Sequence, residues 1–495
     1  MPNGRQPLKT GWGGAIASSA MPHRREGRLP RFVARLLVGV ALLVAPWLFG
    51  ATEDWAWRLL QVVIMLGFVA AACSLKWRRH GSTPAAKPGG AEGGQLSEMA
   101  HRDSAWSWWW GAPFLLLTAY VAVQAGNPSH FYFGDELVPL PHRKGWPSTV
   151  DASTTFEAFL KLLTYGALFW TVRVAFSSRR QAWGLLTALV LNGFFLAMVG
   201  LTQQFSGSDR LLGLRAAGPF SFASFVNRNN YASYANLQIP VAFAVAHHCR
   251  HLALARRLRS HAGNLMVFAA LIMLVSVMAT GSRAGIVLCV GLLIGWGAFE
   301  LWHAAGTVRE TRMIIRGVTL VAVVCAIWVF LAWTESLEMR WSDIWNAPAE
   351  LGPEGGRGAA YQATLRMFQD HRLFGIGAGT FSLAYPYYST ERPDWFRRYA
   401  HNDWLQYLAE LGTVGMFLLV AVGAGICYQQ LRAGRRWKDP DWLALSLWLA
   451  IAGVAVHALV DFPLHIPSIS ILVVAYAALL TVPSVHKYNE QRAAV

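Results

Sequence analysis

The chain has 495 residues, of which 54% are hydrophobic and only 14% are charged. Soluble globular proteins carry about 25% charged residues, so this composition excludes an ordinary soluble domain and indicates an integral membrane protein. A net charge of +16 would suggest nucleic-acid binding in a soluble protein. In a membrane protein, basic residues instead mark the cytoplasmic loops, and no nucleic-acid partner is predicted.

Apolar runs long enough to cross a bilayer, about 18 to 24 residues each, recur along the chain. We predict an all-α polytopic protein with about twelve transmembrane helices, each boundary placed to within about three residues. The first run belongs to this series and follows a long basic tail, so a cleavable signal peptide is not expected. The predicted spans are 32–50, 57–75, 108–125, 157–176, 182–204, 230–247, 264–281, 284–302, 314–334, 403–431, 442–461 and 467–483.

Basic residues indicate the orientation of the chain. With the N-terminus inside, the inside segments hold 26 of the 43 Lys and Arg residues, and the outside segments hold 13, seven of them in the long loop 335–400. Long loops carry little topological weight, so both termini are predicted to be cytoplasmic. The predicted parts are a cytoplasmic basic tail 1–31, a membrane domain 32–334 with the first nine helices, a periplasmic loop 335–401, a membrane domain 402–483 with the last three helices, and a cytoplasmic tail 484–495.

The longest outside segment, 335–401, is too long for a plain connector, and loops of this length are usually functional. Within it, residues 359–371 are predicted to form a short helix. The glycine run 375–381 is predicted to be a tight turn that packs the loop onto the membrane domain, since no strand precedes it as in a nucleotide-binding loop. Residues 80–100 are polar and rich in Gly and Ala, and we predict a disordered linker there. None of the five cysteines lies in an outside segment, so no disulfide framework is implied.

Three arginines, Arg215, Arg228 and Arg283, lie in outside segments next to helix ends. One interpretation is a set of solvated loop charges. The other is a cradle for an anion, because several guanidinium groups at a membrane surface match a diphosphate in geometry and charge. Asn227 and Asn229 can cap the helix that follows them, and a helix N-terminus also favours phosphate, so the two roles are compatible.

The stretch 401–415, HNDWLQYLAELGTVG, begins where the long outside loop enters the membrane. Histidine suits general-base chemistry near neutral pH, so His401 is a candidate base, with Asn402 and Arg398 beside it. The alternative is a structural histidine at a helix start. Glu410 lies about 13 Å deeper on the opposite helix face. A His401–Glu410 dyad is therefore not expected, and Glu410 is assigned a packing role.

Further polar residues and glycines lie near the outside helix ends. Gly412 and Gly415 are predicted to allow close helix contact. Asp461 and His465 lie at another outside helix end, where Asp461 could orient an arginine or a substrate hydroxyl, or be an ordinary interfacial residue. No metal site is predicted, because the outside loops hold no Asp-x-Asp motif and the histidines of segment 247–251 lie at a cytoplasmic end without nearby carboxylates.

Together these motifs resemble the O-antigen ligase / O-antigen polymerase family of bacterial membrane glycosyltransferases. The resemblance covers residues 157–483 and is carried by GPFSFASFVNRNNYASYANLQIP at 218–240, TGSRAG at 280–285, and the block 375–415, which contains GIGAGTF and AHNDWLQYLAELGTVG. The last block is the most specific, because it matches the family's pattern of His-Asn, nine residues and Gly-x-x-Gly with the same spacing.

The resemblance implies a GT-C-like fold and a polyprenyl-diphosphate-linked glycan as the donor. It also implies inverting transfer without a metal or cofactor, at the periplasmic face of the bacterial inner membrane. His401 takes the place of the family's essential external-loop histidine, Arg283 that of an arginine in a helical hairpin, and Arg215 that of an arginine in the preceding external loop. These three would be catalytic. The predicted substrate-binding residues are Arg228, Asn227, Asn229, Asn402, Arg398 and Asp461.

The shared motifs leave several functions open. Ligases of the family join a glycan to lipid A-core, whereas polymerases extend a glycan chain. We take a ligase as the first hypothesis and a polymerase as its alternative. A transporter or flippase for lipid-linked glycans is less favoured, because transporters bind their substrates near the bilayer midplane. A non-catalytic assembly or sensor protein is the last alternative.

Overall fold

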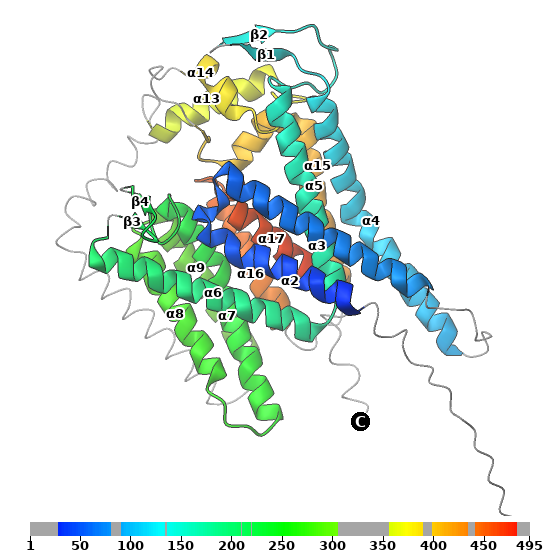
Figure 1. The fold of residues 1–495 in the computed structure, drawn as a ribbon, viewed down its shortest axis with the longest axis vertical. Helices are drawn as coiled ribbons and strands as arrows, with labels where there is room; N and C mark the ends of the chain where they lie inside the picture. The colour runs from blue at the N-terminus through cyan, green and yellow to red at the C-terminus, as the bar shows by residue number, and fades with distance from the viewer. Residues whose placement is uncertain are drawn as a thin grey trace, which may run out of the picture.

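Long helices form a slanted bundle, and a smaller layer caps one end of it (Figure 1). The structure is a computed structural model that describes residues 28–80, 91–133, 136–208, 210–218, 220–304, 356–389, 398–433 and 441–482. The long helices are α2 (Arg28–Val44), α3 (Asp54–His80), α4 (Ala91–Ala125), α5 (Ala152–Ala175), α6 (Arg179–Ser206), α7 (Arg228–Ala255), α8 (Ala262–Ala279), α9 (Arg283–Ala304), α15 (Asp403–Ala433), α16 (Trp442–His457) and α17 (Pro467–Leu480).

Every predicted span except 314–334 overlaps one of these helices, and 314–334 lies outside the described residues. Seven helices of the described chain are long and apolar enough to cross a membrane, and α16 and α17 are shorter apolar helices. An all-α polytopic membrane protein is thereby confirmed. The count of about twelve spans and the GT-C-like arrangement stay predictions. The tail 484–495 and most of the tail 1–31 lie outside the described residues.

Two predictions near the N-terminus need correction. The first helix is shorter than the predicted span 32–50: α2 ends at Val44, and two 3-10 turns follow, η1 (Ala45–Trp47) and η2 (Phe49–Ala51). Pro46 lies in the first turn and Gly50 has φ 72°, a left-handed conformation that breaks a helix. Residues 91–100, predicted as a disordered linker, are instead the first part of α4.

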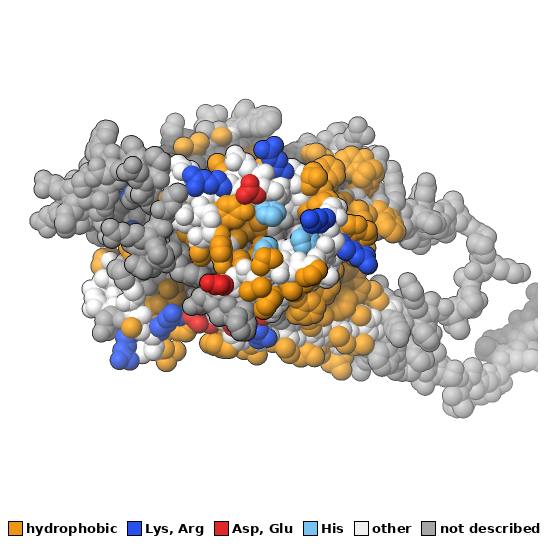
Figure 2. All heavy atoms as spheres, turned by 90° about the horizontal axis from the view of Figure 1, so that it is seen from above, with side chains coloured by type: hydrophobic (Ala, Val, Ile, Leu, Met, Phe, Trp, Pro, Cys, Tyr) orange, Lys and Arg blue, Asp and Glu red, His pale blue; other side chains and the backbone are white. Residues whose placement is uncertain are grey.

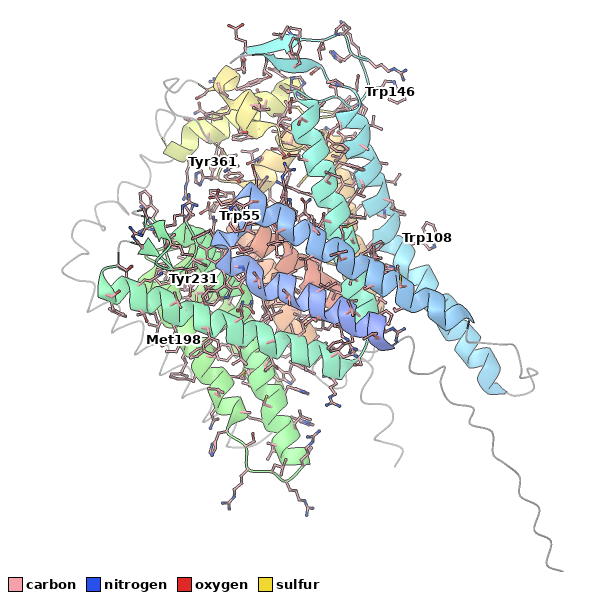
Figure 3. The ribbon with its side chains drawn as sticks, viewed as in Figure 1. Trp55, Trp108, Trp146, Met198, Tyr231 and Tyr361 are labelled. Atoms are coloured by element: carbon pink, nitrogen blue, oxygen red, sulfur yellow. The ribbon has the colours of Figure 1, made fainter. Side chains whose placement is uncertain are left out.

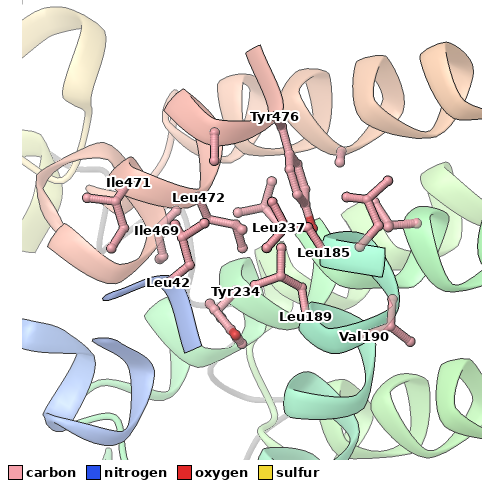
Figure 4. Packing of buried hydrophobic residues seen from close by; sticks show 14 of the residues in the cluster. Leu42, Leu185, Leu189, Val190, Tyr234, Leu237, Ile469, Ile471, Leu472 and Tyr476 are labelled. Atoms are coloured by element: carbon pink, nitrogen blue, oxygen red, sulfur yellow. The ribbon is translucent and has the colours of Figure 1, made fainter. Parts of the chain in front are cut away.

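Helix α7 lies in the middle of the bundle. Its residues from Asn230 to Ala246 are all buried, against α6, α8, α9, α16 and α17. Figure 4 shows apolar side chains of α2, α6 and α17 packed around Tyr234 and Leu237 of this helix. A buried polar group needs a hydrogen bond, and neighbouring helices provide some of these bonds: Tyr476 Oη donates to Gln238 Oε1 at 2.9 Å, and Asn236 Nδ2 donates to Gly285 O at 2.9 Å. Because other helices bond to these polar side chains, α7 can carry them and still lie buried in the middle of the bundle.

The cap contains α13 (Gly356–Asp370), α14 (Phe381–Tyr388) and the antiparallel hairpin of β1 (His130–Phe133) and β2 (Glu136–Pro139) (Figure 1). The short helix predicted at 359–371 is thus confirmed as α13. A second small hairpin, β3 (Arg210–Leu211) with β4 (Arg215–Ala216), lies in the loop before α7. Neither hairpin was predicted, because their strands are too short for a clear alternation of apolar and polar residues.

Helix α15 is broken at Gly412, which has φ 64° and ψ −173°. Around the break, the turn after α13 runs alongside the helix and bonds to it: Ile376 N donates to Ala409 O at 3.0 Å, and Thr413 N donates to Arg372 O at 2.8 Å. A Cβ on Gly412 would lie 2.4 Å from Leu373 O. The prediction of ordinary close helix packing at Gly412 is therefore wrong, since this glycine allows another segment of backbone to approach.

The glycine run 375–381 is confirmed as a tight turn that fixes the cap to the membrane domain. Gly375, Gly377 and Gly379 all have positive φ. Glu410 of α15 holds this turn: its carboxylate accepts hydrogen bonds from Gly379 N at 2.8 Å and from Phe381 N at 3.3 Å. Glu410 was predicted to be a neutral residue that packs between helices, and the structure instead shows it as a hydrogen-bond acceptor for the turn of the cap.

Candidate active site

Four turns that are far apart in the sequence meet at the cap end of the bundle. They are the α2–α3 turn, the loop before α7, the start of α15 and the α16–α17 turn. Ser224 Oγ donates to Pro46 O at 2.6 Å, and a Cβ on Gly50 would touch both Phe225 and Ile466. Figure 2 shows the molecule from above, on the side of the cap, where basic, acidic and histidine side chains lie among hydrophobic ones. These four turns, each predicted separately from the sequence as part of an outside loop, therefore form one surface.

His401 lies at the start of α15 and is held in an unusual backbone conformation. Its φ is 56°, which is uncommon for a residue with a side chain. Tyr361 of α13 donates its hydroxyl to His401 O at 3.0 Å, and Asn402 caps the helix by accepting from Leu405 N at 3.0 Å. Strain that neighbouring residues maintain in this way is typical of functional sites. Asn402 was predicted to bind substrate, and the structure shows it as a helix cap, so its role toward a substrate stays a prediction.

Asp461 is the partner of the His401 side chain. Its carboxylate is 2% exposed, and His401 Nδ1 lies 3.3 Å from its Oδ1. Its two oxygens also accept hydrogen bonds from Asn229 Nδ2 at 2.7 Å and from Phe462 N at 3.0 Å. Because an ionised carboxylate only accepts hydrogen bonds, Nδ1 of His401 carries the proton and donates it. The other ring nitrogen, Nε2, is then left to accept a proton. We name His401, Asp461 and Asn229 the His401 cluster.

The charge of Asp461 is maintained by its neighbours. Burial acts to raise the pKa of this carboxyl, but the hydrogen bond from His401 and the electrostatic influence of His401, His457 and Arg357 outweigh it, and the pKa is lowered. Asp461 is therefore an anion at neutral pH, which is the state that orients a neighbouring imidazole and stabilises it when it becomes protonated.

Because the pKa of Asp461 is lower in the folded protein, its ionised form stabilises the fold. This contribution is present above the ordinary value of 3.8 and is lost as the pH falls through the lowered pKa. We expect Asp461→Asn to reduce the free energy of unfolding at pH 7 by roughly 1–3 kcal/mol, and the difference from the wild type to narrow at pH 3. Thermal melting in detergent at both pH values measures this. The control is Glu136→Gln on the exposed hairpin, and an unchanged difference at pH 3 would contradict the assignment.

A second histidine–carboxylate pair lies one turn away. His465 Nδ1 is hydrogen-bonded to Asp403 Oδ1, and Leu464 N donates to Asp403 Oδ2 at 2.7 Å. Gln406 accepts from Ala400 N through Oε1, so its Nε2 donates to Nε2 of His465 at 3.2 Å and to Glu410 at 3.0 Å. Both nitrogens of His465 are engaged inside the protein. This pair therefore positions the residues before α15, and of the imidazoles of His401 and His465, that of His401 alone has a ring nitrogen left for a substrate.

The predicted arginines lie around this surface at different places. Arg215 forms an ion pair with Glu53 of the α2–α3 turn and lies over the ring of Phe49. Arg228 lies over the ring of Phe220, 5.4 Å from its centroid, and precedes Asn229 directly. Thus Arg228 is the chain neighbour of Asn229 in the His401 cluster, whereas Arg215 is paired with Glu53 of the α2–α3 turn. Their roles toward a substrate stay predictions.

Two further predicted arginines, Arg283 and Arg398, lie on other elements. Arg283 begins α9 and is exposed. The adjacent turn of α9 packs on α7, since a Cβ on Gly285 would lie 2.5 Å from Ala232 Cβ. Arg398 is also exposed and precedes Tyr399, whose ring stacks on Phe462 with centroids 4.3 Å apart. Asn227 caps α7, accepting from Asn229 N at 2.9 Å. The structure thus joins His401, Asp461 and Asn229 directly, and the roles of the other candidates toward a substrate stay predictions.

Three residues of this site were not predicted. Arg357 and Tyr361 come from the first turns of α13, and His457 ends α16 with its Nδ1 hydrogen-bonded to Ser233 Oγ. In the described part of the chain, Nε2 of His457 is buried without a hydrogen-bond partner. A pattern could have drawn attention to His457, because it lies four residues before Asp461, a spacing that places two side chains on one helix face. Nothing in the sequence distinguishes Arg357 from other loop arginines.

The histidines of segment 247–251 are packed rather than arranged as ligands. The ring of His247 lies 4.6 Å from that of Trp442, and the ring of His248 stacks on Trp183 at 4.2 Å. Among the described residues, no group of three or more His, Cys, Asp or Glu side chains is placed to hold a metal ion. The expectation of a metal-free site stays a prediction.

Comparison with known protein families decides the assignment. Residues 268–420 match the family model described as O-antigen ligase. Residues 268–420 thus carry a domain of the O-antigen ligase family, which supports the resemblance to the O-antigen ligase and polymerase family. Search of the curated proteins found no match to the chain. The matched domain includes Arg283, Arg357 and His401 and ends before Asp461. The family supports ligase- or polymerase-type activity of a glycosyltransferase-like membrane enzyme on lipid-linked glycans.

Proposed function

We propose that this protein is an O-antigen ligase of the bacterial inner membrane, with both termini cytoplasmic and its site at the periplasmic face. It would transfer a glycan from a polyprenyl diphosphate to a sugar hydroxyl of lipid A-core. The observation that carries the proposal is the bond between His401 Nδ1 and the buried carboxylate of Asp461, at 3.3 Å. This bond leaves Nε2 of the imidazole as a proton acceptor at the surface where the outside turns meet.

The proposed reaction is a single displacement. Nε2 of His401 accepts the proton of the acceptor hydroxyl, whose oxygen attacks the anomeric carbon of the donor glycan. The bond from this carbon to the diphosphate oxygen breaks, so the configuration inverts and polyprenyl diphosphate leaves as an anion. Asp461 stabilises the imidazolium that forms. Arg283, Arg228 and Arg215 would neutralise the charge that develops on the diphosphate, the kind of electrostatic stabilisation that is usually the largest single contribution.

The same displacement would serve a polymerase if the attacking hydroxyl came from a second glycan chain. A transporter is less favoured, because the polar groups of the site lie at helix ends and not halfway along the helices. The acceptor is therefore the main open choice, and the product of the reaction distinguishes the two enzymes. A ligase gives one glycan on each lipid A-core molecule, whereas a polymerase gives a ladder of longer lipid-linked glycans.

The test is transfer by the purified protein, supplied with a lipid-linked donor glycan and with lipid A-core. We expect Arg283→Ala to reduce the rate by about 10²–10³-fold, as the loss of one group that stabilises transition-state charge does elsewhere. The matched control is Arg143→Ala, an outside arginine that lies over Trp146 at the edge of the cap. Full activity of Arg283→Ala would contradict its role. Movement of the glycan lipid across liposomes without bond formation would favour a transporter.

A further inference from the structure

Arg357 reaches the site from the cap. It lies in the first turn of α13 and is half-buried, and Tyr361 follows one turn later. Residues four apart share a helix face, and the Tyr361 hydroxyl marks where this face points, since it donates to His401 O at 3.0 Å. In Figure 3, Tyr361 lies on the side of α13 that faces the bundle. The geometry therefore directs Arg357 toward the His401 cluster.

The electrostatics agree with this placement. Burial raises the pKa of Tyr361, and the charge of Arg357 opposes that shift. The same guanidinium contributes to the lowered pKa of Asp461, after the larger effects of burial and of the neighbouring histidines. The two affected groups lie on separate elements, Tyr361 on α13 and Asp461 in the α16–α17 turn. Arg357 is thus close to the cluster although about a hundred residues separate it from Asp461 in the sequence.

The N–H groups of the Arg357 guanidinium donate no hydrogen bond to other described residues. Within the described ranges, the structure gives this side chain no hydrogen bond and no ion pair. Asp461 is near, but its oxygens already accept from His401, Asn229 and Phe462 N. A guanidinium has five N–H donors in a planar fork. A half-buried fork without a partner, beside an occupied carboxylate, fits an anion that is brought by a ligand.

We propose that Arg357 binds a phosphate of the polyprenyl diphosphate donor in the His401 cluster. The inference rests on the proposed function and adds a residue of the cap to the binding of the leaving group. A diphosphate offers several oxygens to a guanidinium fork, and the negative charge on it increases as the glycosidic bond breaks. Arg357 would thereby hold the donor between the cap and the bundle, with its anomeric carbon near Nε2 of His401.

Binding of glycan-free undecaprenyl diphosphate to the purified full-length protein tests the inference directly. We expect Arg357→Ala to raise the Kd by about 10- to 100-fold, as expected for loss of a hydrogen bond to a charged group. Arg357→Lys should give an intermediate value, because lysine keeps the charge without the fork. Binding of undecaprenol, which lacks phosphate, should be equal in all variants. The Michaelis constant for the donor should rise with the Kd.

The matched control is Arg366→Ala. Arg366 belongs to the same helix, nine residues later and therefore on the opposite face, where its Nη1 donates to Tyr388 O at 3.5 Å. The Arg366→Ala variant should bind undecaprenyl diphosphate as the wild type does. Equal melting temperatures of the two variants would show that α13 is intact. Wild-type affinity of Arg357→Ala would overturn the inference, and so would equal loss of affinity for undecaprenol.

A third variant separates the inference from the proposed function. His401→Ala should bind undecaprenyl diphosphate normally and fail to transfer the glycan. If His401→Ala transfers glycan at the wild-type rate, the proposed function fails. If His401→Ala is inactive but Arg357→Ala has wild-type affinity and Michaelis constant, the role of Arg357 alone is wrong.

Discussion

Replacement of His401 by alanine is expected to lower kcat for glycan transfer by about 10²–10⁴-fold, the range that one general base contributes. The physical reason is that no other imidazole of the described site has a ring nitrogen that is both unpaired and accessible to a substrate. His465 is engaged by Asp403 and Gln406, and the open nitrogen of His457 is buried. The measurement is single-turnover transfer with saturating donor, which reports the chemical step and not product release.

The matched control for this variant is His142→Ala. His142 lies in the exposed outside loop after β2, where its Nδ1 is hydrogen-bonded to Leu140 O at 3.1 Å, and its loss should leave transfer unchanged. His401→Ala and Asp461→Ala should have non-additive effects, because the two residues act as a unit. Additive losses in the double variant would mean that Asp461 acts through something other than His401.

Replacement of Gly412 by alanine is expected to destabilise the protein by roughly 3 kcal/mol or more. An added Cβ would lie 2.4 Å from Leu373 O and 2.6 Å from Gly375 N, and neither backbone group can move aside alone. The left-handed φ of 64° would also strain any residue with a side chain. Melting of the purified protein, followed by size-exclusion chromatography after heating, measures the loss.

The control is Gly423→Ala in the same helix. Nothing lies within 4 Å of a Cβ placed on Gly423, and alanine favours a helix over glycine by up to about 1 kcal/mol. This variant should melt at the wild-type temperature or slightly above it. If Gly412→Ala behaves in the same way, the break in α15 is not a fixed feature of the fold.

The helices could be predicted from the sequence because a bilayer requires long apolar runs. Such a run can be recognised without knowing which other helices pack against it. Central polar helices are harder to recognise. Helix α7 was found from its length and its apolar half, but its polar residues Asn236 and Gln238 are explained only by Gly285 and Tyr476 on other helices. The break at Gly412 was missed for a similar reason, because a glycine in an apolar helix usually indicates close packing.

The candidate site was predictable residue by residue but not as pairs. His401 and Asp461 were both selected because they lie at outside helix ends, yet they are 60 positions apart, and only the fold brings them together. Arg357 could not be selected, since it resembles every other arginine of a polar loop until Tyr361 fixes the face of α13. In contrast, Arg215 fitted a sequence pattern, and the structure shows a carboxylate partner for it, Glu53.

The docking of the cap onto the break in α15 has a mechanical consequence. Backbone bonds from Ile376 and Gly377 to Ala409 and Glu410 continue on the other side of Gly412 as bonds to Arg372 and Leu373. Tyr120 of α4 joins both segments, because its hydroxyl lies 2.7 Å from both Phe374 O and Leu411 O. The cap therefore cannot swing open like a lid unless this ladder melts. If the proposed lipid-linked donor binds in the His401 cluster, we therefore expect it to enter without a hinged opening of the cap.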